Sequence, residues 1–188
     1  MWMYFKLDTD LAPDVMNTYV RPLNNRSALL DDGSLIDVEA DEIRIPFEYT
    51  MRVRRNVDGT RQDLRMGVYY PGIELMRKEL VDVLHRTGVD NLQTFPARIQ
   101  DEESDLVVDD YVVVNIIGLV TCADGEKSES MPFVDGEYFT KLVIDPSQTG
   151  ELLMFRLAES KMDVIVHEDV AIAVAEKQFP GLLLIPVE

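Results

Sequence analysis

"LVVDDYVVVNIIGLVTC", residues 106–122, is the most apolar run of the chain, and acidic segments flank it on both sides. Its many Val and Ile residues favour a strand, because β-branched side chains pack well on a pleated surface. The run is too long for one ordinary strand, so we expect a helical turn or bend around Asp109-Asp110 followed by a central strand covered on both faces. A transmembrane helix needs about 20 apolar residues, whereas 13 uncharged residues extend from Tyr111 to Ala123. We therefore expect no membrane span and no membrane partner.

Residues 43–53, "IRIPFEYTMRV", alternate between apolar and polar side chains. This period of two predicts a half-buried strand, and its polar face is basic. Asp58-Gly59 then suits a tight turn, because Gly tolerates positive φ and Asp forms local hydrogen bonds. We expect residues 1–69 to be the N-terminal β-rich part of the same domain as the rest of the chain.

Apolar residues at helical spacing predict helices over residues 73–87 and 168–178. Gly88 lies where a left-handed C-cap is expected after the first helix. An apolar strand should follow each helix, and each strand contains a late proline, Pro96 or Pro186. The two helix–loop–strand units suggest an internal repeat.

The segments between the helices are rich in Val, Ile, Phe and Tyr and are separated by Asp-Gly and Asp-Pro turns. A chain of 188 residues with 46% apolar content can bury a sizeable core. We predict an α+β fold: a single domain with a mixed, mostly antiparallel sheet, the 106–122 run at its centre, and a few packed helices. Residues 70–188 would form its α+β region.

The formal net charge is −17, and its distribution is uneven. Most of the 18 Lys and Arg residues lie in residues 1–98, whereas residues 99–188 contain 19 of the 35 Asp and Glu residues. The negative electrostatic field of such an acidic chain repels phosphate backbones, so nucleic acid is not an expected partner. It would accelerate association with a basic protein, although solubility alone is a sufficient reason for an acidic composition.

Motifs of catalysis and of cofactor or metal binding are missing from the sequence. The lone Cys122 closes an apolar strand and is expected to be buried and inert, which favours a reducing compartment. His85 and His167 lie near predicted helix ends and are assigned structural roles. The N-terminus does not resemble a secretory signal, so we expect a cytoplasmic protein. The alternative function is that of an enzyme or small-ligand-binding protein whose site is built from scattered carboxylates.

Two charged clusters are the candidates for binding. The acidic residues are predicted to face a partner, because a buried carboxylate without a counter-ion is costly; they are Asp101, Glu102, Glu103, Asp105, Asp124 and Glu126. Calcium binding by "DEESD" is disfavoured, because the EF-hand order of ligands is absent. The basic residues either bind an anion or pair with the acidic second half, which we favour; they are Arg52, Arg54, Arg55, Arg61 and Arg65.

Residues 70–188 resemble immunity protein family 11, the Myxococcus-type immunity domain of bacterial polymorphic toxin systems. The matching features are the strand leading to Val114-Asn115, the step from Asp124 to Ser128, the "FRL" of residues 155–157, and the closing helix followed by Gly181 and an apolar strand. The resemblance implies a cytoplasmic, non-enzymatic protein that binds and neutralises a cognate toxin, often encoded next to it. It implies no catalytic residue and no cofactor.

Overall fold

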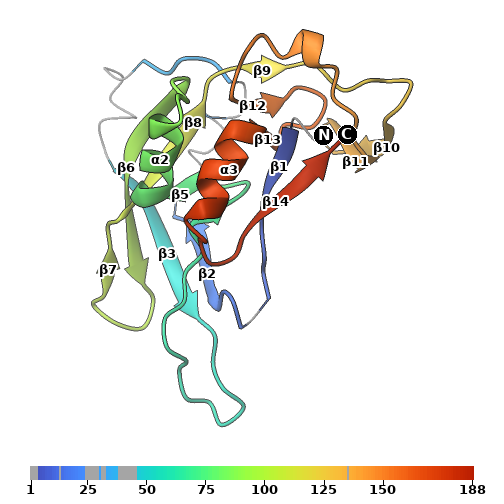
Figure 1. Cartoon of the computed structure of the whole chain (residues 1–188). Helices are drawn as coiled ribbons and strands as arrows, with labels where there is room; N and C mark the ends of the chain where they lie inside the picture. Colours follow the sequence, from blue (N-terminus) through green and yellow to red (C-terminus); the bar gives the residue numbers. More distant parts are fainter. Residues whose placement is uncertain (1–3, 13, 24–29, 31–32, 38–45, 135) are drawn as a thin grey trace.

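A computed structural model describes residues 4–12, 14–23, 30, 33–37, 46–134 and 136–188 (Figure 1). These residues form a five-stranded sheet, a seven-stranded sheet and a separate hairpin. The five-stranded sheet has the order β14 (Leu182–Val187), β1 (Tyr4–Thr9), β13 (Val164–His167), β12 (Met154–Leu157) and β9 (Leu119–Val120). The seven-stranded sheet has the order β2 (Thr18–Pro22), β3 (Phe47–Val53), β6 (Leu92–Asp101), β8 (Tyr111–Ile116), β5 (Leu75–Arg77) and β4 (Tyr69–Tyr70), with β7 (Val107–Val108) also paired to β6. The other elements are the hairpin of β10 (Glu129–Phe133) and β11 (Gly136–Lys141), the helices α2 (Lys78–Arg86) and α3 (Glu168–Glu176), and the 3-10 helix η2 (Pro146–Gln148).

The α+β class and the mixed, mostly antiparallel pairing are confirmed. Within the described part of the chain, β3–β6 and β9–β12 are the parallel pairs, and the other strand pairs are antiparallel. The prediction of one sheet is wrong, because the strands divide between two sheets and a hairpin. Strands from residues 1–69 pair with strands from residues 70–188 in both sheets, through β1–β13 and β3–β6.

The 106–122 run forms three short strands and not one. It bends before Tyr111, as expected, and β8 then lies between β5 and β6 in the centre of its sheet. Gly118, with a φ of 110°, turns the chain into β9 of the other sheet, a conformation that glycine adopts without steric cost. Tyr111 and Val113 face one hydrophobic cluster, whereas Val114 and Ile116 face another, so both faces of β8 are covered.

The predicted helix over residues 73–87 begins five residues late. A tight turn with positive φ at Gly72 and Glu74 reverses the chain after β4. Leu75 and Met76 therefore pair with β8 as part of β5, and α2 begins at Lys78. Two adjacent apolar residues fit a strand as well as a helix, which explains the error. Gly88 does adopt the left-handed C-cap conformation, with a φ of 96°.

Two strand–helix–strand units, β5–α2–β6 and β13–α3–β14, have the same arrangement. Their helices begin at Lys78 and Glu168 and end at Arg86 and Glu176, so the units are offset by 90 residues. In each unit one strand lies between the two that flank the helix and is antiparallel to both: β8 in the first unit and β1 in the second. The internal repeat predicted from the two late prolines is present.

The aromatic contacts of the two units also correspond. Tyr111 of β8 lies 6.2 Å from the ring of Tyr70, and the Arg77 guanidinium lies over Tyr111 at 5.3 Å. In the second unit Tyr4 of β1 contacts Phe155 at 6.1 Å and His167 at 5.6 Å. The middle strand of each unit thus presents a tyrosine to the residue that precedes the helix. Helices α2 and α3 pack beside each other in a core shared with strands of both sheets (Figure 1).

Candidate functional site

The acidic loop, residues 101–105, and the arginine segment, residues 52–65, lie side by side at one edge of the seven-stranded sheet. Strands β3 and β6 run parallel, and Met51 is in register with Asp101. Because parallel strands end at the same edge of a sheet, the segments that follow them begin as neighbours. The Glu102 N–H donates to the Met51 carbonyl at 3.0 Å and joins them at this point.

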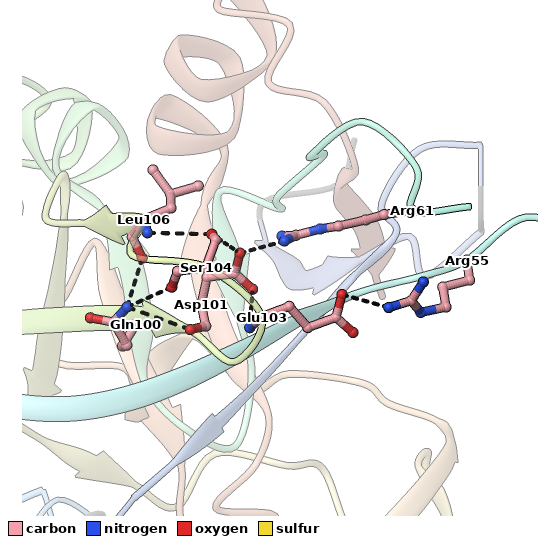
Figure 2. Close-up of polar contacts among 7 residues, drawn as sticks. All are labelled: Arg55, Arg61, Gln100, Asp101, Glu103, Ser104 and Leu106. Carbon is pink, nitrogen blue, oxygen red and sulfur yellow. Dashed lines mark hydrogen bonds and ion pairs between the residues drawn. The ribbon is translucent and has the colours of Figure 1, made fainter. Parts of the chain in front are cut away.

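Asp101 anchors the acidic loop. Its carboxylate is fully buried and accepts hydrogen bonds from Arg61, from the Ser104 hydroxyl, and from the Glu103 N–H at 3.3 Å (Figure 2). Burial alone would raise the pKa of Asp101, but these hydrogen bonds outweigh it and hold the pKa below its ordinary value. Asp101 therefore stays ionised and ties the acidic loop to the arginine segment.

The neighbouring glutamates are also paired. Glu103 accepts a hydrogen bond from Arg55 at 2.9 Å (Figure 2). The same guanidinium donates to the Gly59 carbonyl at 2.6 Å. Glu102 accepts from Arg21 at 2.7 Å. The expected internal pairing is confirmed for Arg55 and Arg61. Asp101, Glu102 and Glu103 are each paired within this chain and are not free as expected, Glu102 through Arg21. Asp105 is exposed and makes no ion pair with a residue in the described ranges.

Asp124 and Glu126 lie elsewhere, in the loop that connects β9 to β10. Lys127 pairs with the Asp124 carboxylate at 2.5 Å, and the Glu126 N–H donates to it at 3.0 Å. The hydrogen bond from Lys127 is the main cause that lowers the pKa of Asp124. The six predicted acids thus belong to two separate loops, and whether either loop binds a partner stays a prediction.

The β10–β11 hairpin presents apolar side chains to solvent. Met131 of β10 is opposite Tyr138 of β11, and Phe133 lies two residues further along the same face. These three side chains are 51%, 53% and 59% exposed, and Val134 at the tip is 86% exposed. Phe139 points to the other face, where it packs against the core. This surface was not predicted from the sequence, although the alternation in "MPFV" and "EYF" around Asp135-Gly136 was a usable signal.

Backbone contacts hold the tip of the hairpin, where β11 begins. The Glu137 N–H donates to the Glu159 carbonyl at 2.7 Å. A Cβ atom on Gly136 would lie 2.4 Å from that same carbonyl oxygen, so glycine alone fits this close approach. The turn end of the hairpin is therefore held against the segment between β12 and β13.

A buried ion pair joins the two sheets. Arg156 of β12 donates to Glu74, which precedes β5, at 2.9 Å, and their side chains are 2% and 4% exposed. Arg156 also donates to the Lys161 carbonyl at 2.9 Å. Sequence reasoning missed this pair because it placed Glu74 in a helix; a single charged residue within the apolar run "LLMFRLA" was the available signal.

The histidines and the cysteine occupy the expected places. His85 lies in the last turn of α2, and its ring contacts the Val89 carbonyl at 3.0 Å. His167 is the N-cap of α3 and accepts from the Asp169 N–H at 3.3 Å. Cys122 is buried, and burial raises the pKa of its thiol to about 12. The thiol is therefore protonated at neutral pH and is a poor nucleophile.

The chain matches no family model and no curated protein at a significant level. The resemblance to immunity protein family 11 therefore stays a prediction. In the described ranges, no helix has the length and apolar character needed to cross a membrane. The same residues contain no group of three or more His, Cys, Asp or Glu side chains placed to hold a metal ion.

Proposed function

We propose that this chain is a non-enzymatic, cytoplasmic immunity protein that binds and neutralises a cognate toxin through protein–protein contact. The outward face of the β10–β11 hairpin carries the proposal, together with the resemblance of residues 70–188 to immunity protein family 11. Exposed apolar side chains gathered on such a hairpin are typical of a surface that a partner covers.

The charges around the hairpin define the kind of partner. Asp124 and Glu126 precede β10, Glu129 begins it, and Glu137 lies in β11. A toxin surface with an apolar pocket and a basic rim would complement this arrangement. In such interfaces, buried aromatic residues supply most of the affinity, while charges at the rim accelerate encounter and exclude wrong partners.

Within this proposal the six predicted acids have different roles. Asp124 and Glu126 belong to the rim of the hairpin surface and would steer the toxin, although Asp124 already pairs with Lys127. Asp101, Glu102 and Glu103 pair with arginines of this chain, so contact with a toxin would first require those pairs to break. Asp105 has no such restraint.

The alternative, a site built from scattered carboxylates, has less support. A carboxylic acid that works as a proton donor near neutral pH needs a raised pKa. The carboxyl groups with resolved shifts, those of Asp58, Asp101 and Asp124, all have lowered pKa values. An acid-rich catalytic site therefore lacks its expected electrostatic signature among these groups.

Coexpression with the product of the neighbouring gene tests the proposed function. We expect that product to arrest growth when expressed alone, and this chain to restore growth. The Met131→Ser/Tyr138→Ser variant should restore growth poorly, because it removes the centre of the apolar face. Ile172→Ser, which removes an exposed apolar side chain on α3, is the matched control and should restore growth fully. A neighbouring product that is neither toxic nor bound would contradict the proposal.

A further inference from the structure

A hollow of about 400 Å³ opens beside β2 and β3, which belong to a different sheet from β10 and β11. Its volume falls within the range of about 300–1,000 Å³ that is usual for small-molecule sites. Four arginines contribute to its wall, in a chain whose net charge is −17. The lining residues are Tyr19, Arg21, Arg52, Val53, Arg54, Arg55 and Glu102.

The sheet register brings these side chains together. Tyr19 is opposite Arg52, and Arg21 is opposite Thr50, in the antiparallel pair β2–β3. Side chains alternate between the two faces of a strand, so Tyr19 and Arg21 point to the same face as Arg52. Arg52 belongs to the basic cluster predicted from the sequence, whereas Arg21 is 31 residues away from it and joins it only through strand pairing.

Hydrogen bonds hold three of the arginines in place. Arg21 donates to Glu102 at 2.7 Å and to the Thr50 hydroxyl at 3.2 Å. Arg55 is held by Glu103 and by the Gly59 carbonyl. Arg54 lies over the Tyr19 ring at 5.3 Å and donates to its hydroxyl. Guanidinium groups that are already oriented lose less conformational entropy when they bind an anion.

Donor capacity remains in the same hollow. The Arg52 side chain makes no hydrogen bond or ion pair with a described residue. Arg54 also lines the hollow, and its Nε is inaccessible, so the donors that it can offer to a ligand are its terminal guanidinium nitrogens. Glu102 and Glu103 balance two of the four arginine charges, which leaves a local excess of positive charge. A dianion would compensate this excess.

We propose that this hollow binds a small phosphate ester with an aromatic ring, and that Arg52 and Arg54 bind the phosphate while Tyr19 contacts the ring. Guanidinium groups match the geometry of phosphate oxygens and form strong, charge-assisted hydrogen bonds. Tyrosine contributes a planar surface on which a ring can stack. The hollow has the size of a nucleoside monophosphate. The site is independent of the proposed toxin binding.

Calorimetric and NMR titrations with AMP, adenosine and inorganic phosphate test the proposal at low ionic strength. We expect saturable binding of AMP, weaker binding of inorganic phosphate, and no saturable binding of adenosine. Equal affinity for AMP and phosphate would overturn the role of the ring. Binding of a longer polyanion such as an oligodeoxynucleotide, without binding of AMP, would overturn the small-molecule assignment.

Three variants locate the site. Arg52→Gln should weaken AMP binding by about tenfold or more, because it removes a charged donor to the phosphate. Tyr19→Leu should weaken AMP binding by about fivefold or more, and by more than it weakens phosphate binding, because it removes the ring contact as well as a contact that orients Arg54. Arg86→Gln, which neutralises an exposed arginine on α2, is the matched control. Thermal melting checks that all three are folded. If Arg52→Gln binds AMP as well as the control does, the hollow is not the site.

Discussion

Arginine and carboxylate side chains meet in two regions of this molecule, and their surroundings differ. The Arg156–Glu74 pair is buried between the two sheets, whereas Arg55–Glu103 and Arg21–Glu102 lie at the surface where the acidic loop meets β2 and the arginine segment. Loss of one partner of a buried pair leaves an uncompensated charge in the core and costs about 3–5 kcal/mol. An exposed pair contributes about 0.2–1 kcal/mol. The buried pair therefore maintains the fold, while the exposed pairs can be exchanged for contacts with a ligand or partner.

The largest loss of stability is expected where a substitution buries a charge that has no partner. Ile116→Asp places a carboxylate on β8, in the core shared with both helices. We expect a loss of more than about 4 kcal/mol of stability and little soluble protein. Soluble yield and urea unfolding measure this. Ile172→Asp, on the exposed side of α3, should express normally. Normal melting of Ile116→Asp would mean that β8 is peripheral.

Arg156→Met should cause the next largest loss of stability, because it leaves the Glu74 carboxylate buried without the guanidinium that pairs with it. We expect a loss of about 3–5 kcal/mol in urea unfolding. The Glu74→Gln/Arg156→Met double variant removes both charges and should recover a substantial part of this loss. If the double variant is as unstable as the single one, the loss comes from packing and not from the unpaired charge.

Asp101→Asn should have an intermediate effect of about 1–3 kcal/mol at neutral pH, because the carboxylate is buried but Arg61 is partly exposed. The pKa of Asp101 is lowered in the folded state, so its contribution is complete above the ordinary value of 3.8 and is lost as the pH falls below it. The stability difference between wild type and Asp101→Asn should therefore shrink in acid. Urea unfolding as a function of pH measures it, and a difference that is constant with pH would refute the ion-pair explanation.

Glu103→Gln should have the smallest effect, less than about 1 kcal/mol, because both members of its pair with Arg55 are exposed to solvent. Moderate salt should abolish the difference in thermal melting between Glu103→Gln and wild type. A loss as large as that of Asp101→Asn would show that the whole acidic loop, and not Asp101 alone, holds the arginine segment in place.

Local patterns in the sequence predicted the elements that depend on local forces. The alternation over residues 47–53 corresponds to β3, whose Phe47, Tyr49, Met51 and Val53 are buried; the predicted residues 43–45 lie outside the described residues. The 168–178 helix is confirmed as α3, ending two residues earlier, and Gly88 has the expected positive φ. Each of these features depends on the spacing of side chains within one segment.

Features that depend on strand pairing could not be predicted in the same way. Leu75 and Met76 suit a strand or a helix equally, and pairing with β8 decides between them. The acidic loop meets the arginine segment because β3 and β6 are parallel, which no residue in either strand encodes locally. Glu74 and Arg156 are 82 residues apart, and their contact requires both sheets to be in place.

Binding of the purified neighbouring gene product tests the central claim that the β10–β11 hairpin captures a partner. We predict that Met131→Ser/Tyr138→Ser weakens binding by tenfold or more, mainly through faster dissociation, as is usual for the apolar centre of an interface. Asp124→Lys/Glu126→Lys should instead slow association at low salt, with a smaller effect at high salt. Ile172→Ser should bind like wild type. If the wild-type complex forms and Met131→Ser/Tyr138→Ser binds with the same affinity, the hairpin is not the interface and the central claim is contradicted.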